Sequence, residues 1–548
     1  MGTRRSRVTE EKELNALRAA TTPGMVATGV PEEVARRYRE EGLWTGDHHW
    51  RMFSRTVERY PDRLAATDRY RSLTWAQLAE TVAAASARLA AVGVCRGDGV
   101  LVQMPNSVAY LETILGVWRL GAIPVMTLPA HGSTEVVHFA DTAPARHYVG
   151  PVKGDRHHAR VIRDLERRRP DVVRVEVDTC SADCPWGTEP VPTPAEVDPA
   201  ELAFLQLSGG TTGVPKLIPK THDDYLYSVR ASLEVCDLDE DSVLLTVLPA
   251  AHNFSMSSPG ILGAMMRGAH IVFSPDPSPM TVLPLMERHR VTHAALVPPM
   301  LLSYLHFPER AGYDLSALRT LWVGGAKLSA AVARRVTPEL GCRLQQVFGM
   351  AEGLVNYTRL DDPEEVVIAT QGRPVSPHDD VRLIDAEGKD VPAGQPGELI
   401  TRGPYTIRRY HRNPEANARS FTEDGFYRTG DIATVDVRGN ITVVGRAKDQ
   451  INRGGEKVAP EAVENALLGH PGVHDASVVG APDEVLGEKI VAYVIPQQGR
   501  ELTAVDLRKF VRESGSSSFA VPDVVEIVSE FPYTGVGKVS KRRQRERR

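Results

Sequence analysis

The sequence predicts an α/β protein whose large N-terminal part contains parallel sheets covered by helices. Short apolar runs at residues 99–103, 123–126 and 270–273 alternate with segments whose apolar residues recur at helical spacing. Parallel strands are joined by helices of this kind, which cover both faces of the sheet and bury the strands. The same pattern predicts buried strands at residues 64–67, 243–248, 294–297 and 321–323.

The helical half of this unit is clearest over residues 74–92, where the apolar positions lie on one helical face and Gly93 ends the pattern. From about Asp379 the pattern changes to shorter, alternating strands separated by turns such as residues 385–388 and 436–440. We therefore expect an antiparallel, barrel-like section to follow the parallel sheets.

A compact α+β segment is expected after Gly445. Its elements are predicted as a helix over residues 460–468, strands over 476–479 and 490–495, and a helix over 503–514. We place a domain boundary near Lys448. This boundary gives an N-terminal domain of residues 31–447 and a C-terminal domain of residues 448–548, with residues 1–30 expected to be loosely ordered.

Composition limits the class of function. The chain has 548 residues, 42% of them hydrophobic and 25% charged, and a net charge of -5, which is typical of a soluble globular protein and argues against a nucleic-acid binder. No apolar run approaches the ~18 residues that cross a bilayer, so we expect no membrane partner. Five scattered cysteines without zinc-site spacing predict reduced thiols in a cytoplasmic protein.

Residues 207–216, Leu-Ser-Gly-Gly-Thr-Thr-Gly-Val-Pro-Lys, follow directly on an apolar run and predict a phosphate-binding loop. Three glycines let successive backbone N–H groups face one anion, and the threonine hydroxyls and Lys216 add donors and charge. The P-loop pattern does not fit, because Val214 stands at its second glycine and Pro215 follows. An ordinary strand-to-helix turn is the alternative.

Further motifs follow in a fixed order. Residues 345–352 carry one carboxylate, Glu352, at an expected strand-to-helix turn, where it could meet a magnesium-phosphate complex. Each motif alone is weak evidence, because an aspartate in a turn or a lysine near a terminus is usually solvated. The presence of all these motifs in one order is informative. The motifs that follow Glu352 are residues 397–403, 427–431, 445–456 and 535–538.

In this order the motifs resemble those of the acyl-adenylate-forming superfamily, which includes acyl-CoA synthetases, luciferases and nonribosomal adenylation domains. Within it, the chain is most similar to the stand-alone aryl-acid adenylating enzymes of siderophore assembly, the 2,3-dihydroxybenzoate-AMP ligases, over about residues 45–540. The resemblance implies an N-terminal domain of two parallel-type α/β subdomains plus a β-barrel-like section. It also implies a small, mobile α+β C-terminal domain.

The resemblance implies the chemistry as well. A carboxylate attacks the α-phosphate of ATP, giving an acyl-AMP and pyrophosphate, with Mg²⁺ as the second cofactor. Lys538 matches the lysine that bridges the acid and the phosphate, Glu352 would help hold Mg²⁺, and Asp431 would bind the ribose hydroxyls. For Lys216 two alternatives remain, a contact with phosphate and a solvated side chain. The remaining nucleotide-binding residues implied are Ser208, Gly209, Gly210, Thr211, Thr212, Gly213, Gly324, Gly325, Ala326, Val347, Phe348, Gly349, Met350 and Arg446.

The acid is expected at residues 251–258, after the strand at 243–248. The resemblance implies that Asn253 pairs with the hydroxyl ortho to the carboxylate and that Ser258 favours a 3-hydroxyl; the alternative is that Asn253 merely caps a helix. Phe254 departs from the tyrosine usual in dihydroxybenzoate ligases, which keeps salicylate and 3-hydroxypicolinate in consideration. We expect Val347 and Val355 to form the walls of the slot that binds the acid, and His252 to line its entrance.

The second half-reaction implied is transfer of the acyl group to the phosphopantetheine thiol of a carrier protein on a separate chain, in siderophore or nonribosomal peptide biosynthesis. A hinge at Lys448 would swing the C-terminal domain between the two reactions. Coenzyme A is the alternative acceptor. A kinase using the 207–216 loop would release ADP, and a regulator that keeps only the fold would be expected to lack Lys538, Glu352 or Asp431.

Overall fold

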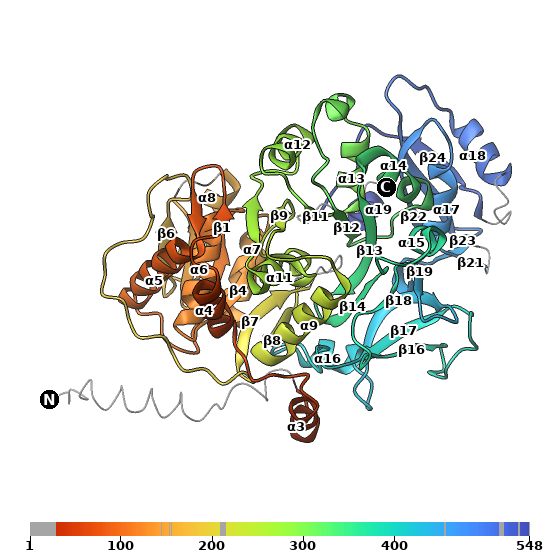
Figure 1. Cartoon of the computed structure of the whole chain (residues 1–548). Coiled ribbons are helices and arrows are strands. Elements are labelled where there is room, and N and C mark those ends of the chain that lie inside the picture. Colours follow the sequence, from red (N-terminus) through yellow and green to blue (C-terminus); the bar gives the residue numbers. More distant parts are fainter. Residues whose placement is uncertain are drawn as a thin grey trace.

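The computed structural model (Figure 1) describes residues 29–143, 145–152, 154, 156–208, 215–453, 456–513, 520–534 and 538–546. Its strands form four sheets. The first elements of the chain and the last ones, drawn in red and in blue, lie at opposite ends of the molecule in this view. Among the described residues, no helix has the length and apolar character that crossing a bilayer requires.

A six-stranded sheet forms one side of the large N-terminal part. Its strands pair in parallel except for the last pair, which is antiparallel. Their spatial order is β6 (Val173–Val177), β5 (His147–Pro151), β3 (Gly99–Gln103), β4 (Ile123–Thr127), β7 (Leu202–Leu207) and β8 (Leu217–Thr221).

A nine-stranded sheet forms the other side. Its centre is parallel, and antiparallel strands stand at both edges. The spatial order is β15 (Arg373–Pro374), β14 (Gly353–Tyr357), β13 (Arg343–Met350), β12 (Thr320–Gly324), β11 (His293–Leu296), β9 (Val243–Thr246), β10 (His270–Phe273), β1 (Leu64–Thr67) and β2 (Ser72–Thr74). The parallel sheets predicted from the alternating pattern are confirmed.

Helices pack on both sheets and fill the space between them. Helix α6 (Val108–Arg119) is buried at all of its positions, and its one acidic residue, Glu112, forms an ion pair with Arg71. The other helices of this part are α3 (Glu32–Glu40), α4 (His49–Arg59), α5 (Trp75–Ala91), α7 (Ser133–Thr142), α8 (Arg156–Arg168), α9 (His222–Val235), α10 (Asn253–Ser257), α11 (Gly260–Arg267), α12 (Pro279–Arg288), α13 (Pro298–Leu305), α14 (Ala330–Leu340), α15 (Glu364–Ala369) and α16 (Pro414–Ser420).

The antiparallel section expected from Asp379 is a four-stranded sheet. A tight turn joins its last two strands, and the Asp436 carboxylate fixes this turn by accepting hydrogen bonds from the backbone N–H groups of Arg438 and Asn440. The strands are β16 (Asp380–Ile384), β17 (Gly397–Arg402), β18 (Tyr427–Val435) and β19 (Ile441–Arg446).

The C-terminal segment is a five-stranded sheet with helices, which confirms the predicted α+β class, although the sequence predicted only two of these strands. Val463 and Leu467 of one helix and Leu507 of another pack into its core. Its strands are β20 (Ile451–Arg453), β21 (Glu456–Val458), β22 (Val473–Asp483), β23 (Gly487–Pro496) and β24 (Val524–Ile527), and its helices are α17 (Pro460–Leu468), α18 (Ala504–Glu513) and α19 (Lys541–Glu546).

Candidate active site

Glu352 lies in the turn between β13 and β14, so the expected strand-to-helix junction is wrong. The chain returns as a strand because Leu354, Val355 and Tyr357 bury their side chains on the sheet, and pairing with β13 satisfies the backbone groups along the edge of β13. Glu352 is 8% exposed, and its Oε1 accepts a hydrogen bond of 2.9 Å from the hydroxyl of Tyr410.

The predicted phosphate loop connects the antiparallel strands β7 and β8, so it is not a strand-to-helix turn. Ser208 and Lys216 close its base: the backbone N–H of Lys216 donates to Ser208 Oγ, 2.9 Å away, and the backbone N–H of Ser208 donates to the Lys216 carbonyl, 3.0 Å away. The residues between them that the sequence singled out lie outside the described residues, namely Gly209, Gly210, Thr211, Thr212 and Gly213.

Lys216 turns toward the same phenol that holds Glu352. Its Nζ lies 4.2 Å from the centroid of the Tyr410 ring, a cation–π contact. Burial lowers the pKa of Lys216, and the Glu352 charge opposes that shift. Lys216 is therefore near Glu352, at the end of the loop expected to hold phosphate.

Asp431 and Arg446 face each other across the β18–β19 pair. Arg446 Nε donates to Asp431 Oδ1 over 2.7 Å, and the aspartate is only 6% exposed. Burial raises the pKa of Asp431, while the Arg446 guanidinium acts in the opposite direction. The strand register therefore places a buried carboxylate and a cation side by side.

Lys538 reaches this pair from the C-terminal segment. A Cβ atom at Gly325 would lie 3.2 Å from Lys538 Cε and 3.7 Å from Lys538 Nζ, so glycine leaves the space that the lysine occupies. Burial, followed by the Arg446 charge, lowers the pKa of Lys538, and Asp431 and Glu352 oppose this. The structure therefore brings together four charged residues that lie as much as 186 positions apart, Glu352, Asp431, Arg446 and Lys538.

Helix α10 presents the residues expected to bind the acid. His252 caps the helix through Nδ1, which accepts a hydrogen bond from the Phe254 backbone N–H over 3.2 Å. The alternative in which Asn253 is the cap is therefore wrong. Asn253 Oδ1 instead accepts a hydrogen bond of 2.8 Å from the hydroxyl of Tyr225 on α9.

Phe254 packs against the end of β12. A Cβ atom at Gly324 would lie 3.2 Å from Phe254 Cζ and 3.1 Å from Val347 Cβ, so only glycine fits between them. Val347, Val355 and Ser258 are each at most 4% exposed. Gly349 also lies against Val355, and the other predicted residues of this region are Phe348 and Met350 on β13 and Ala326 just after β12.

His252, the cap of α10, is affected by the charge of Lys538. Burial, and then the Lys538 charge, lowers the pKa of His252 to about 3, so its imidazole is neutral near pH 7. The charge of Lys538 therefore acts both on the acid-binding helix and on the Asp431–Arg446 pair.

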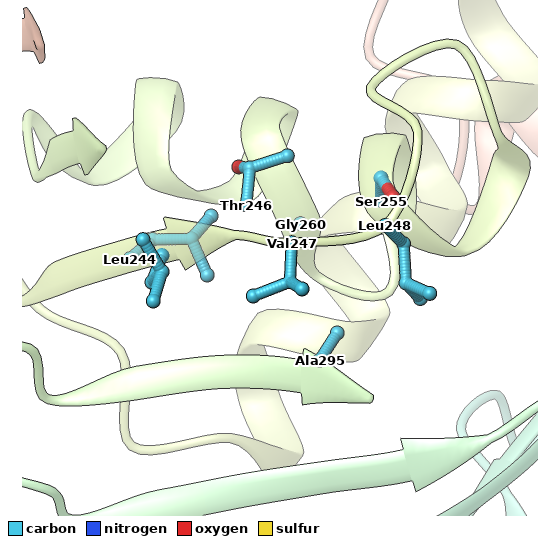
Figure 2. A pocket seen from close by; sticks show the side chains of 8 residues that line it. Leu244, Thr246, Val247, Leu248, Ser255, Gly260 and Ala295 are labelled. Atoms are coloured by element: carbon cyan, nitrogen blue, oxygen red, sulfur yellow. The ribbon is translucent and has the colours of Figure 1, made fainter. Parts of the chain in front are cut away.

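A small cavity lies behind α10 (Figure 2). It measures about 10 Å³, enough for about one water molecule, and its lining is mostly apolar. Within the described ranges, the buried hydroxyls of Thr246 and Ser255 have no hydrogen-bond partner. The cavity is lined by Leu244, Leu245, Thr246, Val247, Leu248, Ser255, Gly260 and Ala295.

Sequence reasoning missed Tyr410 and Tyr225. Tyr410 is 58 positions from the carboxylate that it holds, and Tyr225 is 28 positions from Asn253. Neither tyrosine belongs to a short motif, and no spacing in the sequence connects them to these partners.

Two family models match the chain, the AMP-binding enzyme over residues 53–411 and the AMP-binding enzyme C-terminal domain over residues 462–538. The chain belongs to the AMP-binding enzyme family. It is 48% identical over 524 residues to 2,3-dihydroxybenzoate-AMP ligase of Bacillus subtilis, covering 95% of this chain and 97% of that protein. It is 41% identical over 525 residues to salicyl-AMP ligase / salicyl-S-ArCP synthetase of Mycobacterium tuberculosis, covering 93% of each.

The apo structure of MbtA from Mycobacterium smegmatis has the same fold, with a TM-score of 0.72 and 42% identity over 94% of this chain and 98% of that one. These matches confirm the superfamily and the fold class that the motif series predicted.

Proposed function

We propose that this enzyme activates an ortho-hydroxy aromatic acid, such as 2,3-dihydroxybenzoate or salicylate, with ATP. A carboxylate oxygen attacks the α-phosphorus, the bond from that phosphorus to the bridging oxygen of the β-phosphate breaks, and pyrophosphate leaves. The observation that carries the proposal is the position of Lys538, which lies against Gly325 and whose charge acts on Asp431 and His252. A cation there lowers the repulsion between the attacking carboxylate and the phosphate.

The other charged residues take the nucleotide. Asp431 is held by Arg446 with its carboxylate buried, which suits it to accept hydrogen bonds from the ribose hydroxyls. Mg²⁺ bound to the ATP phosphates would neutralise charge on the leaving group. The described residues contain no group of three or more His, Cys, Asp or Glu side chains placed to hold a metal, which suits Mg²⁺ held by one carboxylate, Glu352, together with phosphate and water.

The second step is transfer to a thiol. The thiol attacks the carbonyl carbon of the aryl-AMP, the bond from that carbon to the phosphate oxygen breaks, and AMP leaves. The relative from Mycobacterium tuberculosis is named as a salicyl-S-ArCP synthetase, which supports the phosphopantetheine arm of an aryl carrier protein in siderophore biosynthesis as the acceptor. All five cysteines are free thiols, which suits the cytoplasm, where such a carrier and ATP are present.

ATP–pyrophosphate exchange with a panel of acids tests the activation step. We expect exchange with 2,3-dihydroxybenzoate, salicylate or 3-hydroxypicolinate, and rates at least roughly tenfold lower with benzoate, because a site built for a polar group rejects the analogue that lacks it. The absence of exchange with every aromatic acid would overturn the proposal. In the presence of the preferred acid, thioester formation with holo-carrier protein or with coenzyme A then identifies the acceptor.

Asn253→Ala is expected to lower the preference for salicylate over benzoate by about tenfold, the value of one hydrogen bond of ~1–1.5 kcal/mol. The measurement is the ratio of kcat/KM values in pyrophosphate exchange. Ser255→Ala on the same helix is the control, because Ser255 lines the small cavity behind α10 (Figure 2). An Asn253→Ala enzyme with the wild-type ratio would remove Asn253 from the acid site.

Lys448→Pro is expected to spare adenylation while lowering thioester formation by roughly tenfold or more. Lys448 lies in the short turn Ala447–Asp449 between β19 and β20, where we place the hinge between the domains of residues 31–447 and 448–548. Proline fixes φ and so restricts rotation at this position. Single-turnover assays of both half-reactions, with Lys448→Ala as the control, measure the effect, and equal losses in the two steps would argue against a hinge here.

A further inference from the structure

Tyr225 forms a buried hydrogen bond with Asn253, the polar residue proposed for the acid site. The residue is 2% exposed on α9, and its hydroxyl donates to Asn253 Oδ1 over 2.8 Å. Burial raises the pKa of the Tyr225 phenol well above its usual range, so it remains protonated at neutral pH and must place its hydrogen on an acceptor. The Asn253 carbonyl oxygen is that acceptor.

The Tyr225 ring is fixed by its neighbours. It packs edge-to-face on Phe204, with ring centroids 4.5 Å apart and planes at 80°. Lys220 Nζ lies 6.0 Å from the centroid of the ring and donates to the backbone carbonyl of Tyr405 over 2.7 Å. The phenol hydroxyl therefore cannot follow a moving asparagine without repacking the core between α9 and β7.

The Asn253 side chain does not cap the helix, although asparagine at the start of a helix often does. His252 caps α10, so the Asn253 side chain is not needed by the backbone. Because the amide oxygen points to Tyr225, the opposite edge of the amide carries the NH₂ group, which donates hydrogen bonds and accepts none.

We infer that Tyr225 is a positioning residue that orients the Asn253 amide with its NH₂ group toward the acid, so that the enzyme selects ortho substituents that accept a hydrogen bond. The inference rests on the proposed function and narrows its substrate class. A 2-hydroxyl directs its hydrogen to its own carboxylate and leaves oxygen lone pairs for the amide. A 2-amino group, whose lone pair is delocalised into the ring, is a donor, and two donors would face each other.

Tyr225→Phe tests this orientation. Without the phenol hydroxyl the amide is free to turn and present its oxygen, so we expect the kcat/KM ratio for salicylate over 2-aminobenzoate to fall by about tenfold, the value of one hydrogen bond. Pyrophosphate exchange is measured for both acids and for benzoate, which has no ortho substituent and serves as the internal reference. The ratio does not depend on the fraction of enzyme that is folded.

Tyr227→Phe is the matched control. Tyr227 lies on the same helix and is also buried, but its hydroxyl pairs with Ser376 Oγ over 2.7 Å. This variant removes the same atoms and is expected to keep the wild-type ratio. Tyr225→Leu removes the hydroxyl by a different substitution and is expected to reproduce the shift seen with Tyr225→Phe.

The outcomes separate this inference from the function on which it rests. A wild-type enzyme that adenylates no aromatic acid would overturn the proposed function. A wild-type enzyme that adenylates salicylate, with an unchanged ratio in both Tyr225 variants or an equal shift in Tyr227→Phe, would overturn the inference alone.

Discussion

Lys538→Ala should lower the rate of aryl-adenylate formation by roughly two to three orders of magnitude, the loss seen when one transition-state charge stabiliser is removed. Lys538 is the cation that comes from the C-terminal segment to Gly325, Asp431 and Glu352. Two anions must meet at this point, and alanine leaves their repulsion uncompensated. The measurement is kcat for pyrophosphate exchange at saturating ATP and acid.

Lys509→Ala is the control for this variant. Lys509 lies on α18 of the same C-terminal segment, and its side chain is 68% exposed and 3.9 Å from Glu513. Removing it takes away the same charge at an exposed position of α18, so exchange should stay within about twofold of wild type, as for a typical exposed substitution. Near-normal exchange in Lys538→Ala would reject the assignment of Lys538 as the catalytic lysine.

Asp431→Asn is expected to raise the KM for ATP by roughly ten- to a hundredfold. The carboxylate is buried against Arg446, and hydrogen bonds that involve a charged group contribute about 1.5–3 kcal/mol each. The amide removes the charge and turns one acceptor into a donor, which cannot accept from a ribose hydroxyl. The KM for the acid should change little, because the role proposed for Asp431 is to bind the ribose.

The control for Asp431→Asn is Asp436→Asn, which changes a carboxylate just beyond the same strand. Asp436 accepts backbone hydrogen bonds in the β18–β19 turn, so the variant is expected to alter stability but not the KM for ATP. Thermal unfolding measured for both variants separates the two effects. An unchanged KM for ATP in Asp431→Asn would remove this residue from the ribose site.

The sequence predicts the sheets well because a buried strand or helix shows a local pattern of apolar residues. The strand at Gly99–Gln103 and the helix at Pro460–Leu468 have the predicted bounds, since each is an apolar pattern bounded by polar or turn residues. The charged site is also predictable, because the order of its motifs identifies the family. Those motifs are enough to single out Glu352, Asp431 and Lys538, which the fold then brings together.

The features that the sequence could not predict depend on pairing between residues that are distant in the chain. The chain after Glu352 forms β14 because β13 offers an edge with which to pair, and nothing local to residues 353–357 records that edge. In the same way, the sequence leaves open the alternative that Asn253 caps α10, and only the structure excludes it, because His252 caps the helix and Asn253 Oδ1 accepts from Tyr225. Side-chain partners fixed by tertiary contact leave no short motif in the sequence.

The fate of the carboxylate oxygen is the most direct test of the proposed mechanism. The acid is supplied with ¹⁸O in both carboxylate oxygens, together with ATP, Mg²⁺ and the thiol acceptor, and the phosphorus-containing products are analysed by mass spectrometry. Attack on the α-phosphorus predicts pyrophosphate without label and AMP that carries one ¹⁸O. Label in orthophosphate with release of ADP would mean attack on the γ-phosphorus and would contradict adenylation.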